Sequence, residues 1–369
     1  MSPRFDSRLS LRAAYETIER SRSPRTGGAR AFYTPLRGWS PTYSEATGIL
    51  IETVVRAAET LKEPRGEALA RSFGEFLLDI QHPDGGWHAG MWPPRRTGRL
   101  GAFTTAQIVH GLCQLYGFTR ETQWLESAQR GAEWLTRTVG DGEPTYYTQV
   151  AWAMLEHWSL TGDSRSRNAA ICILDSAASR RTILGAFNAW GFYGSDAAFT
   201  HTIGYVLRGF IESARLLDAW PRYGKPLRLA LLRLAEDALA SKGRLPGAYD
   251  SAWQSERQYT CSSGNAQIAL ALLSAYRFLP DERFVHGARS LVDEVARRQV
   301  GRERAMPALR GAIPASYPLW GRYLPGRYPV WTAKYLCDAI VALAVQDHAE
   351  ARDADQIRAA SPAVAFSTI

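Results

Sequence analysis

Two kinds of apolar pattern alternate along the chain. In the first kind, one apolar stripe runs along a helical segment whose reverse side is charged. The segment 67–81 is an example, because Phe73, Phe76 and Leu77 recur at helical spacing opposite Glu67 and Arg71. A helix of this kind packs one face on a core and exposes the other to solvent. We therefore predict outer helices over 9–21, 67–81, 121–139, 164–179, 226–241 and 282–299.

The second kind of segment is apolar nearly all round, as in 266–275 and 339–345, which is typical of a buried helix. Six such runs begin directly after loops rich in Gly, Pro and aromatic residues. Their openings lie at 41–44, 101–104, 144–147, 198–201, 259–262 and 328–331. Ser and Thr at these starts suggest N-caps, since a hydroxyl oxygen can accept a free N–H of the first turn.

The regular alternation of outer and inner helices predicts an all-α fold, an (α/α)6 toroid of six helical hairpins. Each hairpin buries its apolar stripe against its neighbours, and a closed ring satisfies all six. No linker divides the chain, so we expect one toroid over residues 1–348. Residues 349–369 turn polar and Ala-rich, which indicates a partly disordered tail.

The predicted loops are unequal in length. Those that lead from outer to inner helices are long, at 82–103, 180–199, 242–261 and 300–328, whereas the returns are mostly short. Long loops on a rigid scaffold commonly carry the functional residues. We therefore expect the pocket to open at the long-loop rim, where the six openings meet.

Composition excludes several other functions. The net charge of +8 is spread over the chain with no Lys/Arg block, so a nucleic-acid partner is not expected, while an anionic substrate is compatible. No apolar run approaches the ~18 residues that span a bilayer, and the N-terminus lacks a signal sequence, so we expect a cytoplasmic protein. The cysteines are scattered without metal-ligand spacing, which predicts buried free thiols, no metal and no cofactor. Their positions are Cys113, Cys172, Cys261 and Cys337.

One short motif resembles a known superfamily. Phe76-Leu77, Gln81, Gly85 and Trp87 match the QW motif of the squalene cyclase and prenyltransferase toroids. The resemblance implies the same fold and a structural role, with Gln tying a helix end to the next turn and Trp stacking on it. It also raises a terpenoid cyclase or prenyltransferase as an alternative function. However, the acidic Asp-x-Asp-Asp string of class II cyclases does not occur in this chain.

The same fold serves polysaccharide lyases, glycoside hydrolases and sugar epimerases. Aromatic platforms and arginine forks on the long-loop rim would suit an anionic glycan. The expected substrate-binding residues are Trp87, His88, Trp92, Asn188, Trp190, Trp253, Trp320, Arg322 and Tyr323. Part of these aromatic residues would instead pack the loops together.

The densest chemical stretch follows the fourth opening. On a helix, His201, Tyr205 and Arg208 share one face. With Asn188, these residues are similar in kind to the set of toroidal polysaccharide lyases, which implies that His201 and Tyr205 act as acid and base. Arg208 would lie deeper and could pair with Glu212.

A hydrolase would instead need two carboxylates about 5 to 10 Å apart. Five acidic residues near the rim are candidates: Glu45, Asp84, Asp196, Asp250 and Asp338. Asp250, between Tyr249 and Trp253 in a loop, suits a catalytic role best. Asp84 is expected to shape a turn, and Asp338 to pair with Lys334. No two of the five form an obvious pair.

The stretches 200–205, 311–323 and 328–335 resemble uncharacterised bacterial toroid proteins associated with polysaccharide biosynthesis. Together these patterns predict a carbohydrate-active enzyme of lyase, hydrolase or epimerase type, acting on a sugar or an anionic glycan. A terpenoid cyclase-like enzyme and a non-catalytic glycan-binding toroid remain alternatives, and the oligomeric state is open.

Overall fold

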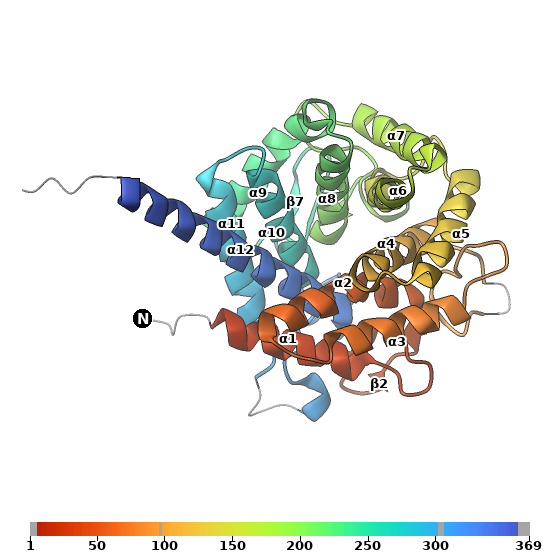
Figure 1. The fold of residues 1–369 in the computed structure, drawn as a ribbon. Coiled ribbons are helices and arrows are strands. Elements are labelled where there is room, and N and C mark those ends of the chain that lie inside the picture. Colours follow the sequence, from red (N-terminus) through yellow and green to blue (C-terminus); the bar gives the residue numbers. More distant parts are fainter. Residues whose placement is uncertain (1–5, 96–97, 302–305, 361–369) are drawn as a thin grey trace, which may run out of the picture.

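The computed structural model describes residues 6–95, 98–301 and 306–360, with side chains up to residue 348. Twelve α-helices in this part of the chain form two concentric rings (Figure 1). The outer helices are α1 (Ser7–Ser21), α3 (Gly66–Asp79), α5 (Thr122–Thr138), α7 (Ser164–Ser179), α9 (Arg228–Ala240) and α11 (Glu282–Arg297). The inner helices are α2 (Ser44–Leu61), α4 (Ala102–Thr119), α6 (Thr148–Thr161), α8 (Thr200–Leu216), α10 (Ser262–Tyr276) and α12 (Val330–Ala360).

The inner ring is closed. Each inner helix packs against the next, and α12 contacts both α10 and α2, which joins the two ends of the chain. Most outer helices pack on the inner helix that precedes them, as α3 does on α2 and α11 on α10. The predicted (α/α)6 toroid is therefore confirmed. The predicted tail overlaps the end of α12, which runs to Ala360, and residues 361–369 lie outside the described part.

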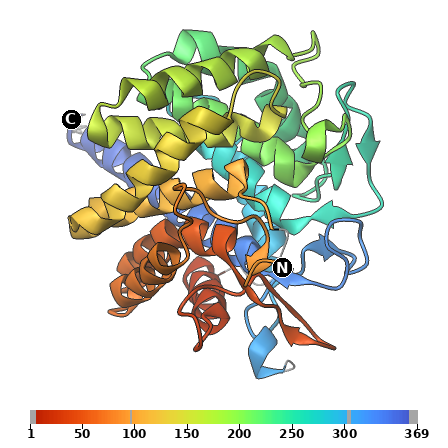
Figure 2. The same cartoon turned by 90° about the vertical axis from the view of Figure 1, so that its right-hand side faces the viewer.

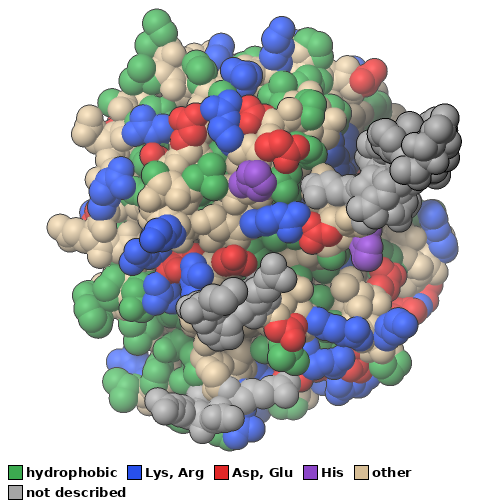
Figure 3. Space-filling model, turned by 90° about the vertical axis from the view of Figure 1, so that its left-hand side faces the viewer, with side chains coloured by type: hydrophobic (Ala, Val, Ile, Leu, Met, Phe, Trp, Pro, Cys, Tyr) green, Lys and Arg blue, Asp and Glu red, His purple; other side chains and the backbone are tan. Residues whose placement is uncertain are grey.

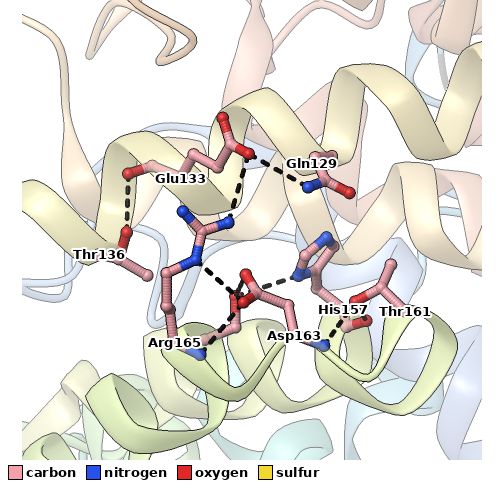
Figure 4. Close-up of polar contacts among 8 residues, drawn as sticks. Gln129, Glu133, Thr136, His157, Thr161, Asp163 and Arg165 are labelled. Atoms are coloured by element: carbon pink, nitrogen blue, oxygen red, sulfur yellow. Dashed lines mark hydrogen bonds and ion pairs between the residues drawn. The ribbon is translucent and has the colours of Figure 1, made fainter.

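Aspartate side chains cap three of the six outer helices, α1, α7 and α11. Asp6 Oδ1 accepts the N–H of Leu9 at the start of α1. At the short return between α6 and α7, Asp163 Oδ1 accepts the N–H of Arg165 at 3.1 Å and also pairs with the Arg165 guanidinium (Figure 4). Such a cap satisfies N–H groups that have no partner within the helix. The same arginine reaches Glu133 on α5, 3.5 Å away, and so links two outer helices.

The N-caps predicted for the inner helices are wrong. Helices α2, α4, α6, α8 and α10 begin without a side-chain cap. Their hydroxyls instead hold the rim loops, since Thr47 Oγ1 accepts from Ala29 N at 2.9 Å and Thr105 Oγ1 from Trp87 N at 3.1 Å. The polar first turns of the inner ring therefore anchor neighbouring chain segments.

Short antiparallel strands, which the sequence pattern did not predict, order these loops. Among the described residues they are β1 (Phe32–Thr34), β2 (Gly38–Trp39), β3 (Thr42–Tyr43), β4 (Met91–Trp92), β5 (Ala198–Phe199), β6 (Ala248–Tyr249), β7 (Ser255–Glu256), β8 (Thr260–Cys261), β9 (Ser316–Tyr317) and β10 (Tyr328–Pro329). Strand β1 pairs with β10 in the register Phe32–Pro329, and β5 pairs with β6. Figure 2 shows strands gathered at one end of the ring, with the C-terminal end of α12 at the other.

The motif at Gln81 and Trp87 has a structural role. Gln81 Nε2 donates to the carbonyl oxygens of Gly85 and Ser127, at 2.8 and 2.9 Å, and so ties the end of α3 to the next turn and to α5. Trp87 is fully buried, and its indole N–H donates to the Leu77 carbonyl at 2.8 Å. A Cβ on Gly131 would lie 2.8 Å from the Trp87 ring, so α5 needs a glycine there.

The distribution of charged side chains agrees with the prediction, whereas the burial of the cysteine thiols agrees only in part. Cys113, Cys261 and Cys337 are buried, as predicted, but Cys172 on the charged helix α7 is exposed. Basic and acidic side chains are interspersed over the face in Figure 3, as expected for solvent-facing outer helices. No described helix combines the length and the apolar character needed to cross a bilayer.

Candidate active site in the rim cavity

A cavity of about 780 Å³ opens where the inner helices begin, at the end that carries the long loops. We call it the rim cavity. Its walls come from the N-terminal turns of α2, α4, α8 and α12, from the 3-10 turn Thr145–Tyr147, and from four rim loops. The predicted position of the pocket is therefore confirmed. Its polar and aromatic lining includes Tyr43, Glu45, Phe103, Thr104, Tyr146, Tyr147, Phe192, Tyr193, His201, Tyr205, Tyr323, Arg327 and Trp331.

His201 lies in the first turn of α8 and is 3% exposed. Gln267 Nε2 lies 3.3 Å from the His201 carbonyl oxygen, and this contact fixes the orientation of the amide. The same Nε2 therefore donates to His201 Nδ1, at 2.7 Å. Burial lowers the pKa of the imidazole to about 3. The neutral ring consequently carries its proton on Nε2, which makes this nitrogen a hydrogen-bond donor.

Aromatic rings surround His201. The Tyr205 ring lies 4.6 Å from the imidazole centroid and the Tyr323 ring 5.0 Å from it. Burial raises the pKa of the Tyr205 hydroxyl well above its usual value, so this phenol stays protonated. Tyr323 is held in place by the indole N–H of Trp331, which donates to its hydroxyl at 3.1 Å.

Glu45, near the start of α2, supplies the carboxyl group of the lining. Its Oε2 accepts from the hydroxyls of Tyr43 and Thr104, at 2.8 and 3.1 Å. No described residue hydrogen-bonds Oε1. Burial raises the pKa of the carboxyl, and the two hydroxyls offset this only in part. A protonated Glu45 would therefore hold its proton on Oε1, since Oε2 is engaged as an acceptor.

Among the residues that the structure describes, the lining contains no second Asp or Glu. The one arginine of this described lining is Arg327, whose guanidinium lies over the Phe32 ring, 4.9 Å from the centroid. Stacking of this kind leaves the N–H edge of a guanidinium free for an anion. The rim cavity thus combines one carboxyl, one neutral imidazole, one cation and several phenols.

Of the residues expected from the sequence, the structure brings His201, Tyr205 and Tyr323 together in the rim cavity. Three tryptophans expected as stacking walls belong to the core instead, and their indole N–H groups all donate to backbone carbonyls. These are Trp87, Trp190 and Trp253. A buried indole needs such a partner, and packing alone therefore accounts for these three residues.

Other expected substrate-binding residues lie near the rim but outside the cavity lining. The His88 ring packs edge-on against His82, and the Trp92 ring lies against Phe76. Trp320 is 79% exposed and lines a separate pocket of about 510 Å³. None of these three side chains faces Glu45 or His201 across the rim cavity.

The polar residues expected in loops have local roles. Asp250 Oδ1 accepts the N–H groups of Ala252 and Gln254, at 2.9 and 2.8 Å, and so shapes a turn. Arg322 pairs with Glu256 at 2.9 Å on the exposed rim. Asn188 is exposed and bonds to its neighbours through its backbone. The structure therefore brings neither Asp250, Arg322 nor Asn188 into the cavity.

The sequence pattern offered Glu45 as a candidate, but Asp250 was preferred. Arg322 was likewise preferred to Arg327 among the rim arginines, and Tyr146 and Tyr147 were given no role in binding. A usable signal was present. Glu45, Thr104, Tyr146, His201 and Trp331 all occupy the openings of inner helices or directly follow them. Because these openings converge on one axis, side chains at the start of each inner helix are stronger candidates than residues in the long loops.

Comparison with protein families finds none that matches the chain, and comparison with curated proteins also finds none. Solved structures do match in fold. An unsaturated glucuronyl hydrolase specific for heparin is 12% identical, with a TM-score of 0.72 over 93% of this chain and 98% of that one. A sugar epimerase from a ruminal bacterium is 13% identical, with a TM-score of 0.69 over 91% and 97%.

A third structure is a mutant unsaturated glucuronyl hydrolase from Streptococcus agalactiae complexed with dGlcA-GalNAc6S. It is 12% identical, with a TM-score of 0.65 over 92% of this chain and 93% of that one. At such identities the likeness establishes a shared toroid, and chemistry must be argued from the residues of this chain.

Proposed function

We propose that this protein is a carbohydrate-active enzyme whose rim cavity binds one residue of an anionic sugar or glycan and transfers a proton from Glu45. The observation that carries the proposal is the Glu45 carboxyl. Its pKa is raised by burial, and one of its oxygens makes no hydrogen bond to described residues. A carboxyl with a raised pKa holds its proton to higher pH, which suits general-acid catalysis.

The other groups of the cavity suit binding of an anionic sugar. Arg327 can hold a carboxylate or sulfate, and phenol rings such as those of Tyr146 and Tyr147 can pack on the apolar face of a pyranose. The six inner helices also begin at this end, and helix N-termini favour negative charge. Because the His201 pKa is low, we assign the imidazole N–H to substrate binding and not to proton abstraction.

The single carboxyl narrows the reaction. Hydrolysis of a saturated glycoside ordinarily uses two carboxylates, whereas Glu45 is the one carboxyl group among the described residues of the lining. Reactions that need one acid include protonation of the C4–C5 double bond of an unsaturated uronyl residue. Glu45 would donate its proton to C4, water would add at C5, and the resulting carboxylate would take up the proton that the water loses. The hemiketal would then open by cleavage of the C5–O5 bond, which leaves a ketone at C5 and a hemiacetal at C1. Breakdown of this hemiacetal to an aldehyde would release the linked sugar as an alcohol.

A specific observation also favours a second function. Aromatic walls around one carboxyl with a raised pKa would suit a terpenoid cyclase, since an acid can protonate an alkene and aromatic faces stabilise carbocations. Arg327 and the imidazole N–H of His201 favour a polar substrate. The two proposals therefore differ in which substrates bind.

A substrate panel tests both proposals. Unsaturated uronyl disaccharides would lose the absorbance of the double bond, uronic-acid polymers would gain it in a lyase reaction, and epimerisation of reducing disaccharides would be followed by NMR. Polyprenyl diphosphates and squalene form the terpenoid arm. We expect turnover of an anionic sugar that Glu45→Gln abolishes and the matched rim variant Glu256→Gln leaves intact. Turnover in the terpenoid arm alone would refute the proposal, and saturable glycan binding without product would indicate a binding toroid.

A further inference from the structure

A second cavity, of about 420 Å³, is also lined by the inner helices. On each helix that lines both cavities, the residues of this second cavity come later in the sequence than those of the rim cavity. We call this second cavity the base cavity. All six inner helices contribute to it, and its lining is rich in charged side chains. Four carboxylates line it: Glu52, Glu156, Glu212 and Asp338. Its volume is within the range of small-molecule sites.

Two of these carboxylates are neutralised on one side of the base cavity. Glu52 pairs with Arg56 at 2.8 Å and lies 3.5 Å from His110 Nε2. Burial would raise the pKa of Glu52, but His110 and the neighbouring cations outweigh it, and the pKa is lowered. Asp338 pairs with Lys334, as the sequence predicted, and also accepts from a threonine hydroxyl. Neither carboxylate is left without a cation.

The other two carboxylates share one arginine. Arg215 lies 3.0 Å from Glu212 and 3.6 Å from Glu156. Glu212 also accepts from the hydroxyl of Ser274, at 2.8 Å. The predicted pair between Arg208 and Glu212 is therefore wrong, because Glu212 already has other partners.

Arg208 is left as a cation without an ion pair or hydrogen bond to any described residue. Its guanidinium lies over the Trp152 ring, 4.8 Å from the centroid, and its Nε is buried. His110 packs on the same indole at 4.6 Å, and its buried Nδ1 likewise has no described partner. Buried polar groups nearly always have partners, so two orphaned nitrogens in one cavity wall require an explanation.

We propose that the base cavity binds a small oxyanion, a carboxylate or a phosphate, through Arg208. Stacking on Trp152 holds the planar guanidinium in one orientation, and its free N–H groups can meet two oxygens of one anion. Arg277, an exposed cation of the same lining without a described partner, would add to the attraction. This site is separate from Glu45 and does not depend on the function proposed for the rim cavity.

The test is thermal unfolding of the intact protein against inorganic phosphate and, separately, acetate, with ionic strength held constant by sodium chloride. A ligand that binds only the folded state raises the melting temperature in a saturable manner. We expect such a rise with at least one of the two anions. The anion that binds more tightly shows whether the site prefers a phosphate or a carboxylate. Arg208→Met should weaken binding at least tenfold, and Arg277→Met only a few-fold.

Three further variants complete the test. Arg228→Met, an exposed arginine on the outer helix α9, carries the same charge change and should bind as the wild type does. Arg327→Met removes the cation that we propose to hold an anion in the rim cavity, so the part of the rise that depends on Arg208 should persist in this variant. A rise that is lost in Arg327→Met and kept in Arg208→Met would place the anion in the rim cavity and overturn the proposal. Arg208→Lys keeps the charge but not the planar fork, and should bind several-fold more weakly. The proposal would also be overturned if the melting temperature of the wild type rose without saturation, or if Arg208→Met or Arg208→Lys bound the anion with unchanged affinity.

Discussion

The two cavities of the inner ring are built from the same six helices but differ in chemistry. The rim cavity is lined by phenols, one carboxyl and a neutral imidazole, whereas the base cavity is lined by ion-paired carboxylates and arginines. The rim cavity lies at the end with the long loops, where burial raises the pKa of Glu45 and lowers that of His201. At the other end of the same helices, arginine and lysine side chains pair with the carboxylates, and helix C-termini favour such cations. One set of helices therefore presents two chemically different ends, one with few charged groups and one with many ion-paired groups.

The largest expected effect is a difference in kcat between a carboxyl variant of the rim cavity and a carboxylate variant of the base cavity. Glu45→Gln removes the proposed proton donor and should lower kcat by about 10²–10⁴-fold. Glu212→Gln, which alters a base-cavity carboxylate, should leave kcat within about two-fold, although it loosens the pair with Arg215. Steady-state kinetics on any substrate found in the panel measures both. Equal losses in the two variants would mean that the cavities do not have separate roles.

The dependence of the reaction rate on pH tests whether Glu45 acts as the general acid. A general acid must hold its proton, and the pKa of Glu45 is raised above the ordinary glutamate value. The rate should therefore be highest at acidic pH and fall about tenfold per pH unit above that pKa. A rate that rises with pH through this region would identify Glu45 as a base.

A second comparison concerns aromatic residues of the core and of the cavity. Trp87→Ala should cost about 3–5 kcal/mol of unfolding free energy, because a fully buried indole leaves a large void. Tyr147→Ala, at the half-buried wall of the rim cavity, should cost much less and act chiefly on KM. Urea unfolding and kinetics on both variants test this contrast. Loss of sugar affinity in a folded Trp87 variant would restore the stacking role once expected of it.

The buried imidazole of His201 is expected to have an intermediate effect on the free energy of unfolding at acidic pH. Its folded pKa of about 3 lies below the ordinary value of about 6.5, so the unfolded chain binds the proton more readily. Above about pH 6.5 this difference in pKa does not affect stability. As the pH falls toward 3 it lowers the free energy of unfolding, by about 3 kcal/mol at pH 4. His201→Gln should therefore lose less stability than the wild type between pH 7 and pH 4. Equal losses in urea unfolding would show that the imidazole is not buried in its neutral form.

The smallest effect is expected on the exposed rim. Arg322→Ala breaks only an exposed ion pair with Glu256, which should cost less than about 1 kcal/mol, and it should leave KM unchanged. A large rise in KM would return Arg322 to the substrate-binding residues.

Much of the fold was readable from the amino-acid sequence because helical periodicity is local. The segment predicted over 164–179 is α7 with the same limits, and all six openings mark starts of inner helices. The site was readable only in part. His201 was found from its spacing with Tyr205. The loop residues Asp250 and Trp190 were assigned to catalysis and to substrate binding, respectively, without knowledge of where the loops run.

The sequence by itself therefore determined the alternation of helices, the closed ring and the end at which the rim cavity opens, since these follow from short-range periodicity and loop length. Only the tertiary structure decided which side chains meet in each cavity. Glu45 owes its raised pKa to burial in a cavity whose walls come from other inner helices and distant rim loops, and Arg208 is left unpaired because Arg215 already holds Glu212. Such properties depend on contacts between segments far apart in the chain, which no local pattern encodes.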